Sequence, residues 1–188
     1  MVTATSPTQA LTYGDLLNTP QNDGNRYEIL GGDLFVTASP SKRHAWICAR
    51  PSRWMGTYVE KRKLGEVFAT PVDVQLTMHD VVVPDILFLS QERLHLFDDQ
   101  KIVGAPDLIV EVLSPSTRSR DLTAKLHLYA QTGVQEYWIV DQVSAAVTIY
   151  WRMPIGSYEL LPSEQNKVKS RVIPGFELVS DELIAGLD

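Results

Sequence analysis

The segment Leu108–Leu113 constrains the fold of this chain more than any other, because it is almost entirely apolar, with the sequence LIVEVL. A continuous apolar run of this length predicts a strand buried at the centre of a sheet. One acid, Glu111, interrupts the run. A lone carboxylate in a buried strand is costly unless it is paired or holds a cation. The segment therefore predicts a central strand that carries an acid with a specific partner.

A second acid, Asp85, interrupts the apolar sequence VVVPDILFL of residues 81–89, which predicts another strand. If both strands belong to one sheet, strand alternation can turn Asp85 and Glu111 toward one point. Two carboxylates, completed by waters and a substrate phosphate, are a usual way of holding Mg²⁺. Two alternatives stay open: Asp85 follows Pro84 and could simply enter the strand, and Glu111 could form a structural pair with Lys125 or an arginine.

The helix expected over residues 118–132 carries Lys125, fourteen residues after Glu111. A cation projecting from this helix over the strand could orient an attacking water and neutralise a phosphate. Tyr129, one helical turn further on, would line or support the same face, or belong partly to the core. The alternative for Lys125 is a surface ion pair with Asp121 at i,i+4 spacing. The combination of two acids and a following lysine favours the functional interpretation.

The remaining pattern predicts a mixed α+β (α/β) fold, with a mixed central β-sheet flanked by helices and an N-terminal β-hairpin. Pro51 is expected to kink or split the first helix near Arg50. We expect a single domain over residues 1–188, with a core at about 27–152 and a strand-poor C-terminal tail at 153–188. The other expected elements are the hairpin at 27–38, a helix at about 41–63, and strands at 67–69, 72–77, 137–140 and 147–151.

The chain has 188 residues, of which 44% are hydrophobic and 21% are charged. These values predict one globular domain and exclude disordered, collagen-like and coiled-coil chains. The single cysteine, Cys48, excludes an internal disulfide and a cysteine zinc cluster. No apolar run approaches a membrane span, and residues 1–10 lack the features of a signal peptide. We therefore expect a cytoplasmic protein with no membrane partner.

Charge is segregated along the chain, although the formal net charge is only −6. Residues 41–65 carry +6, whereas residues 66–113 carry −7. This pattern is consistent with a phosphate-facing surface beside a cation site, but taken alone it favours a solvated basic helix. The basic residues that we expect to contact nucleic-acid phosphates are Arg43, Arg50, Lys61, Arg62, Lys63, Arg118 and Arg120.

Several motifs of this chain resemble the Uma-two family of endonucleases, which is similar to the PD-(D/E)xK, or restriction-endonuclease-like, nucleases. The resemblance covers about residues 27–180. The motifs that carry it are YEILGGDL, SPSKRH, PVDVQL, VPD at 83–85, GAPDLIVEVLSPST at 104–117, DLTAKLHLY at 121–129 and GVQEYWIVD at 133–141.

The resemblance implies a nuclease core with the element order αβββαβ. It assigns the first and second acids of the superfamily motif to Asp85 and Glu111, which would hold Mg²⁺ or Mn²⁺. The usual lysine, two residues after the second acid, is replaced by Leu113, and the resemblance moves its role to Lys125 on the next helix.

Auxiliary roles fall on His44, Glu28 and Tyr129, with Asp73 as a weaker candidate because strand register is not determined by the sequence. His44 has an equally good structural interpretation, as a residue near a helix N-terminus. Pro51 departs from the family pattern and bears on the position of His44.

These observations lead to the hypothesis of a Mg²⁺-dependent endonuclease that hydrolyses phosphodiester bonds of DNA, acting as a monomer or a homodimer. The alternative is a catalytically degenerate nuclease-fold module that binds nucleic acid or a protein partner. A third possibility is a small-molecule phosphohydrolase or a purely structural domain.

Overall fold

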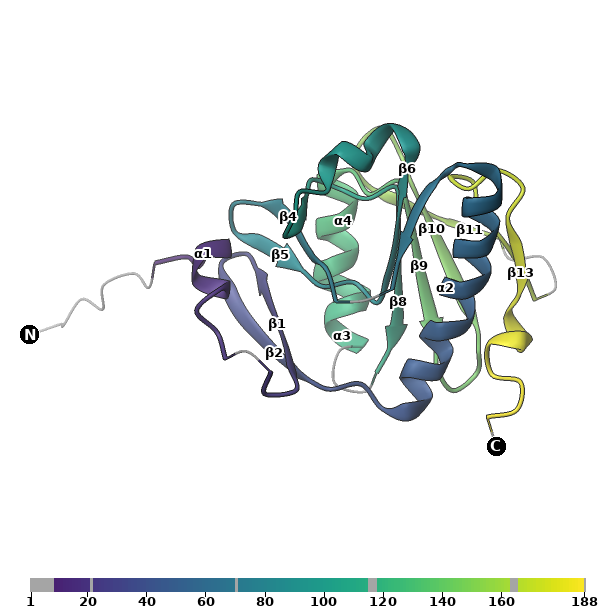
Figure 1. Ribbon diagram of the computed structural model, residues 1–188, viewed down its shortest axis with the longest axis horizontal. Coiled ribbons are helices and arrows are strands. Elements are labelled where there is room, and N and C mark those ends of the chain that lie inside the picture. The colour runs from purple at the N-terminus through teal and green to yellow at the C-terminus, as the bar shows by residue number, and fades with distance from the viewer. Residues whose placement is uncertain (1–8, 21, 70, 115–117, 163–165, 188) are drawn as a thin grey trace, which may run out of the picture.

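The computed structural model describes residues 9–20, 22–69, 71–114, 118–162 and 166–187. Its described strands form a six-stranded sheet, a five-stranded sheet and a small two-stranded sheet (Figure 1). The helical elements are α1 (Tyr13–Leu16), α2 (Lys42–Arg62), η1 (Gln91–Leu96), α3 (Arg118–Arg120), η2 (Asp121–Lys125), α4 (Leu126–Thr132) and η3 (Ser180–Leu183).

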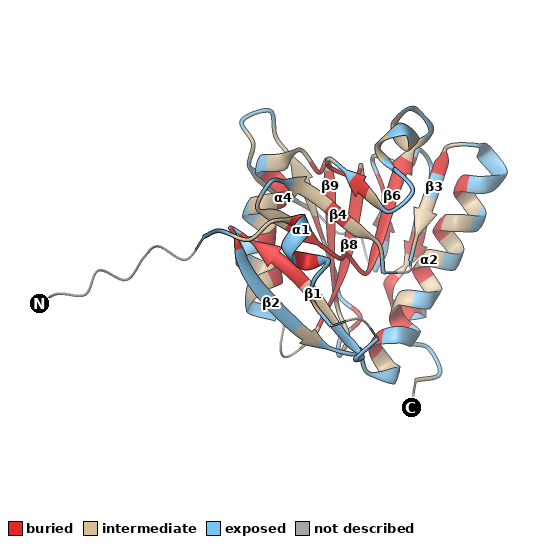
Figure 2. Ribbon diagram, turned by 60° about the vertical axis from the view of Figure 1, so that its left-hand side comes forward, coloured by how far each residue is buried: buried red, intermediate tan, exposed pale blue. Residues whose placement is uncertain are grey.

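The six-stranded sheet has its most apolar strand in its interior. Its strands, in spatial order, are β11 (Tyr158–Leu161), β10 (Val147–Arg152), β9 (Glu136–Asp141), β8 (Leu108–Leu113), β6 (Ile86–Ser90) and β3 (Gly65–Phe68). Strand β8 pairs parallel with β9 and antiparallel with β6. All six of its residues are buried, as Figure 2 also shows. The predicted central strand and the mixed character of the sheet are confirmed.

Alternation along β8 divides the core into two layers. Val110 and Val112 face α2, and this layer also includes Ile47 and Met55 of that helix. Ile109 lies on the opposite face of the sheet, in the layer that contains α4. Figure 1 shows α2 and α4 on opposite sides of β8. Because Glu111 follows the same alternation, it faces α4 and the five-stranded sheet.

The five-stranded sheet covers the α4 side of the site. Its strands, in spatial order, are β2 (Asp33–Ala38), β1 (Asn25–Leu30), β5 (Asp80–Val82), β4 (Asp73–Thr77) and β7 (Lys101–Val103). Strands β1 and β2 form the predicted antiparallel hairpin across Gly31 and Gly32, which both have positive φ. This hairpin brings Arg26 and Glu28 to the charged cluster beside the central sheet.

The prediction of one strand over residues 81–89 is wrong. The segment divides into β5, which belongs to the five-stranded sheet, and β6, which belongs to the six-stranded sheet. Pro84 lies between them and has no N–H to donate to a ladder, so pairing stops there. Asp85 therefore lies where the chain crosses from one sheet to the other, rather than within a continuous strand.

Helix α2 runs from Lys42 to Arg62 without a break, so the expected split at Pro51 does not occur. Proline removes one helical hydrogen bond and strains the preceding turn. Pro51 is itself buried, and the flanking Ile47 and Met55 lie in the core. Burial of this face keeps the helix continuous and leaves the predicted position of His44 unchanged.

The C-terminal segment contains more strand than expected. Strand β11 extends the six-stranded sheet, and β12 (Lys167–Lys169) pairs with β13 (Glu177–Val179). Ile173, Phe176 and Leu183 pack into the same core layer as α2. The prolines of this segment lie outside its three short strands. Because proline usually interrupts strands, the sequence pattern predicts few strands here.

No helix among the described residues is long and apolar enough to cross a membrane.

The contact between β3 and β6 generates a stability prediction. Gly65 has a φ of +146°, and a Cβ added there would lie 2.0 Å from the carbonyl oxygen of Leu89. We predict that Gly65→Ala lowers the free energy of unfolding by at least about 2 kcal/mol, measured by urea denaturation. The matched control is Gly31→Ala, where φ is +60° and the Cβ meets nothing within 4 Å, so the loss is about 1 kcal/mol. Equal losses would contradict the steric explanation.

Candidate active site

Asp85, which immediately precedes β6, lies opposite Glu111 of the neighbouring strand β8. Ile86 of β6 pairs with Val110 of β8, so the antiparallel register places the preceding Asp85 opposite the following Glu111. The backbone N–H of Val112 donates to Oδ2 of Asp85 at 2.8 Å, which fixes this carboxylate against the central strand. Both carboxylates are buried.

Two cationic or polar side chains hold Asp85 from other elements. Arg26 of β1 donates to Oδ1 at 2.9 Å, and Nε2 of His44 lies 3.1 Å from Oδ2. Burial alone would raise the pKa of Asp85, but the hydrogen bond and charge of His44 and the charge of Arg26 outweigh it. The pKa falls to about 2, so Asp85 is an anion at neutral pH.

Glu111 makes its contacts with the helix that follows its strand. Nζ of Lys125 and the hydroxyl of Tyr129 both donate to Oε1 of Glu111, at 2.8 and 2.9 Å. These two residues are one helical turn apart, and both are almost fully buried. Lys125 thus projects back over the strand of Glu111 and forms with it the ion pair that was the structural alternative for this acid.

Lys125 is shared among three carboxylates. Besides Glu111, its Nζ lies 2.8 Å from Oε1 of Glu28 in the hairpin and 3.7 Å from Oδ1 of Asp121. Asp121 and Lys125 begin and end a π-helical segment, η2, between α3 and α4. Single π-helical turns inside α-helices occur often at functional sites. Burial opposes the charge of Lys125, but the three carboxylates raise its pKa above the ordinary value, so it is an ammonium.

The cluster has an excess of negative charge when His44 is neutral. Burial, and then the charges of the neighbouring acids, raise the pKa of Glu111 to about 8, although Lys125 opposes the rise. Glu111 competes with Glu28 and Asp121 for the single ammonium of Lys125. The buried acids are Asp85, Glu111, Glu28 and Asp121, and the cations facing them are Arg26, Arg120 and Lys125. A proton or a bound cation can neutralise the remaining charge.

Comparison with known proteins identifies the family to which this chain belongs. Residues 12–181 match the model of the Uma2 (Uma-two) family, which is described as "putative restriction endonuclease". The chain belongs to the Uma2 family. An uncharacterized protein of Synechocystis sp., slr1290, is 25% identical over 190 residues, covering 97% of this chain and 95% of that protein.

A solved structure supports the fold of this Uma2 protein. It is the crystal structure of a protein from Anabaena variabilis described as a putative nuclease belonging to DUF820. The TM-score is 0.75 at 20% identity, and the match covers 92% of this chain and 97% of that chain. This likeness confirms the predicted fold class, a mixed α+β fold with mixed sheets flanked by helices.

Of the auxiliary residues, His44 and Glu28 contact the charged cluster, whereas Asp73 lies apart from it. His44 is in the first turn of α2, where its backbone N–H donates to the Ser41 hydroxyl at 3.1 Å. Its imidazole ring contacts Asp85. Glu28 accepts the N–H of Val83 at 3.0 Å as well as the ammonium of Lys125.

Asp73 lies on β4 and interacts with Tyr13 and Lys101. Burial raises the pKa of Asp73, and a hydrogen bond from Tyr13 opposes the rise. Among the described residues, no hydrogen bond or ion pair joins it to Asp85 or Glu111.

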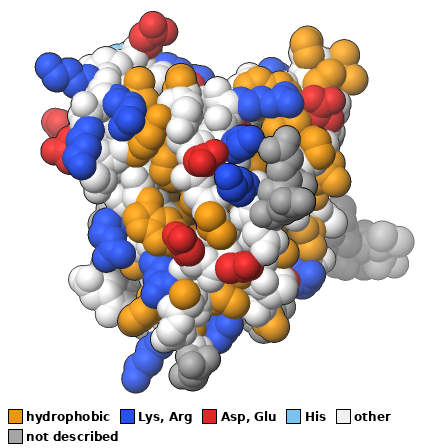
Figure 3. All heavy atoms as spheres, turned by 90° about the vertical axis from the view of Figure 1, so that its right-hand side faces the viewer, with side chains coloured by type: hydrophobic (Ala, Val, Ile, Leu, Met, Phe, Trp, Pro, Cys, Tyr) orange, Lys and Arg blue, Asp and Glu red, His pale blue; other side chains and the backbone are white. Residues whose placement is uncertain are grey.

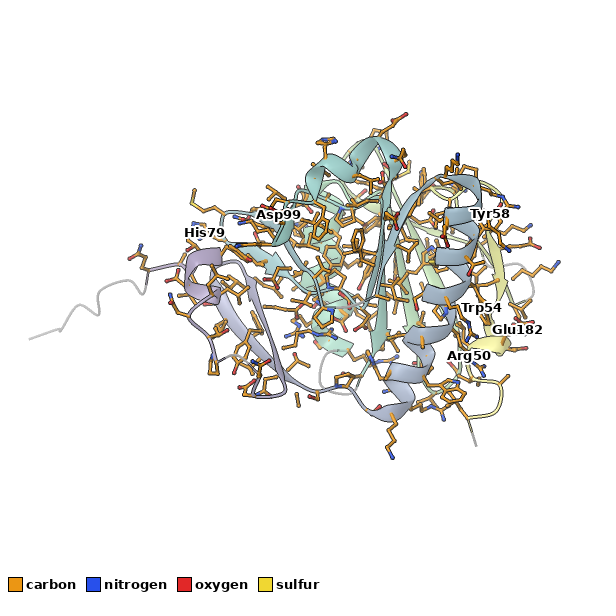
Figure 4. All side chains as sticks on the ribbon, in the orientation of Figure 1. Arg50, Trp54, Tyr58, His79, Asp99 and Glu182 are labelled. Atoms are coloured by element: carbon orange, nitrogen blue, oxygen red, sulfur yellow. The ribbon has the colours of Figure 1, made fainter. Side chains whose placement is uncertain are left out.

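The predicted phosphate-binding residues are mostly engaged elsewhere. Arg43 donates to the carbonyls of Gln142 and Leu187. Arg50 donates to the carbonyls of Glu182 and Ala185, and Figure 4 shows Arg50 beside Glu182. Both arginines thus bind the C-terminal segment to α2.

Lys61, Arg62 and Lys63 lie at the far end of α2, about 25 Å along the helix from His44. On the face of the molecule drawn in Figure 3, lysines and arginines are interspersed with apolar and acidic side chains. Arg118 pairs with Asp141 at 2.9 Å, leaving Arg120 as the predicted basic residue within the cluster.

The sequence interpretation missed Arg26 and Cys48. Arg26 and Glu28 are two residues apart on β1, so they share a face of the hairpin, and this charged alternation was the available signal. Cys48 is one turn after His44 on α2, with its Sγ 3.5 Å from Nδ1 of that residue. His44, Cys48 and Asp85 have ligand atoms within 4.8 Å of one another and form a candidate metal group.

The oxygen ligands fit a hard cation better than the thiol does. Burial, and then the charge of Asp85, raise the pKa of the Cys48 thiol well above its ordinary value. A metal needs the thiolate, so this sulfur is a poor ligand at neutral pH. Asp85 and Glu111 together offer the oxygens that Mg²⁺ and Mn²⁺ prefer.

A pH dependence of stability follows from Glu111. Because its pKa is about 8 in the folded protein and about 4.5 in an unfolded chain, the folded state retains a proton between these values. Stability therefore falls as pH rises from about 4.5 to 8, by up to about 1.4 kcal/mol for each pH unit. Melting temperatures of wild type and Glu111→Gln between pH 5 and 9 test this, since the variant lacks the proton. Parallel curves would contradict the assignment.

Metal titration distinguishes the two ligand sets. We predict that Asp85→Asn abolishes Mn²⁺ binding measured by calorimetry, because it removes an anion common to both sets. Cys48→Ser, which keeps the volume of the side chain, leaves the affinity within about twofold if the oxygens bind the ion. A large loss in Cys48→Ser would identify the sulfur-containing set instead.

Proposed function

We propose that this Uma2 protein is a Mg²⁺-dependent endonuclease that hydrolyses phosphodiester bonds of DNA. One observation carries the proposal. Lys125 reaches Glu111 from the following helix at 2.8 Å, where the strand itself has Leu113 in place of a lysine. The site thus combines two acids that face each other with a lysine that comes from the following helical segment and not from the strand of Glu111. Family membership supports a nuclease activity.

Asp85 and Glu111 would hold the metal ion from opposite strands. Bound there, Mg²⁺ would supply a more acidic water and would stabilise the charge that develops on the phosphate. Arg26 and the N–H of Val112 orient Asp85, and Tyr129 orients Glu111. These contacts determine which carboxylate oxygens remain available.

Lys125 would act on the phosphate or the attacking water from its position beside Glu111. Its ammonium is buried and already desolvated, so it favours a phosphate oxygen or an incoming water strongly. Glu28, which also binds Arg120, and Asp121 hold the ammonium in position beside Glu111. A homodimer, with one copy for each strand, is the assembly that would cut a duplex on both strands.

Cleavage of plasmid DNA tests the proposal. With Mg²⁺ or Mn²⁺, we predict that Glu111→Gln and Lys125→Met each reduce the nicking rate by about 10²–10³, because each removes charge stabilisation of the reaction. Lys167→Met removes a lysine from β12 and serves as the control, with a rate within about twofold of wild type. Equal rates in Glu111→Gln and wild type would contradict the mechanism.

The degenerate module remains the second candidate, because Glu111 and Lys125 are only 3% and 2% exposed and hold each other in a buried network. A wild-type protein that binds DNA without cleaving it under any divalent metal would favour this alternative.

A further inference from the structure

Two cavities meet at Asp85. The smaller has a volume of about 220 Å³ and extends to Glu111 and Lys125. The larger, about 780 Å³, lies between α1, the start of β1 and α2. The residues that line both cavities are Arg26, Ser39, Pro40, His44 and Asp85. The acids of the site thus lie at the boundary of two chambers.

The chambers differ in charge. The smaller contains the buried cations and acids of the cluster described above. In the larger, Arg26, Asp73 and Asp85 are the only lysine, arginine, aspartate or glutamate side chains among its described lining residues. Arg26 is already paired with Asp85. The described lining of the larger chamber therefore lacks the row of unpaired basic side chains that would bind successive phosphates.

The lining of the larger chamber suits an uncharged, flat group. Leu16, Leu17 and Ala49 supply apolar surface, Tyr27 supplies an aromatic ring, and Asn22 supplies an amide. Its volume lies within the range of pockets that accept small organic ligands, about 300–1,000 Å³. Apolar and aromatic walls with a few neutral donors and acceptors are how proteins accommodate an unstacked nucleobase.

We propose that the larger cavity receives one unpaired base of the substrate, while the adjacent phosphate enters the smaller cavity at Asp85. This assignment rests on the proposed nuclease function and specifies its substrate class as single-stranded or locally unpaired nucleic acid. A continuous duplex does not fit, because its stacked pairs cannot enter a chamber of this volume. The shared wall gives the base and the phosphate separate places on either side of Arg26.

Nucleic-acid binding without divalent metal tests this assignment independently of cleavage. A fluorescein-labelled single strand and the same strand annealed to its complement are titrated with the wild-type protein in EDTA, and anisotropy is recorded. We expect the single strand to bind at least about tenfold more tightly than the duplex. We expect a shallow salt dependence, with a slope between about −1 and 0, because the larger cavity offers the phosphates only Arg26, which is paired with Asp85.

A cavity-filling substitution provides the structural test. Ala49→Trp places an indole in the larger chamber from the exposed face of α2 and is expected to weaken single-strand binding by about tenfold. Thr57→Trp, two turns along the same helix and outside the described lining, is the matched control with unchanged affinity. Ala45→Trp repeats the test if the first variant has a lowered melting temperature.

The outcomes separate the two proposals. Single-strand binding that Ala49→Trp weakens supports the base-binding cavity even if no divalent metal permits cleavage, in which case the nuclease function fails. Duplex preference, a steep salt slope, equal affinities of Ala49→Trp and Thr57→Trp, or the absence of binding would each overturn the cavity assignment. Cleavage of duplex by wild type and Ala49→Trp at equal rates would overturn it while leaving the nuclease function intact.

Discussion

The ammonium of Lys125 is the interaction on which the rest of the site depends. It is buried at the point where three separate elements meet: Glu28 comes from the hairpin, Glu111 from the central strand, and Asp121 from the start of its own helical segment. A buried ammonium without these acids would be very costly, and so would the acids without the ammonium. The ion cluster therefore joins the five-stranded sheet, the six-stranded sheet and the crossover helix into one arrangement.

The helical position of the lysine has a simple geometric explanation. Residue 113 lies on the same face of β8 as Glu111, but in this chain it is a leucine that packs into the core layer. A lysine on the crossover helix approaches Glu111 from above the sheet instead. Asp121 and Lys125 are four residues apart, so both side chains lie on the face of the helix that is turned toward the strand. Tyr129 then follows at one further turn and contacts the same carboxylate oxygen.

Much of this arrangement could be predicted from local sequence patterns. An apolar run with one acid is sufficient to identify β8, and glycines between alternating residues identify the hairpin. The contact between Lys125 and Glu111 follows from a strand and a helix joined by a short crossover.

The features that the sequence could not predict concern partners distant along the chain. Arg43 looked like a phosphate-binding residue, yet it donates to a carbonyl 144 residues away. No local pattern encodes such a contact. The division of residues 81–89 between two sheets has the same origin, because proline can end a strand or merely begin one. Tertiary packing decided both cases.

The hairpin has a consequence for the electrostatics of the whole site. Arg26 and Glu28 lie on one strand, β1, and each is bound to a different part of the acidic cluster. Any displacement of β1 would remove the counterion of Asp85 and a counterion of Lys125 at the same moment. Movement of the hairpin would therefore change the electrostatic field at Asp85 and at Lys125 together, with opposite signs, because Arg26 and Glu28 lie only two residues apart on β1.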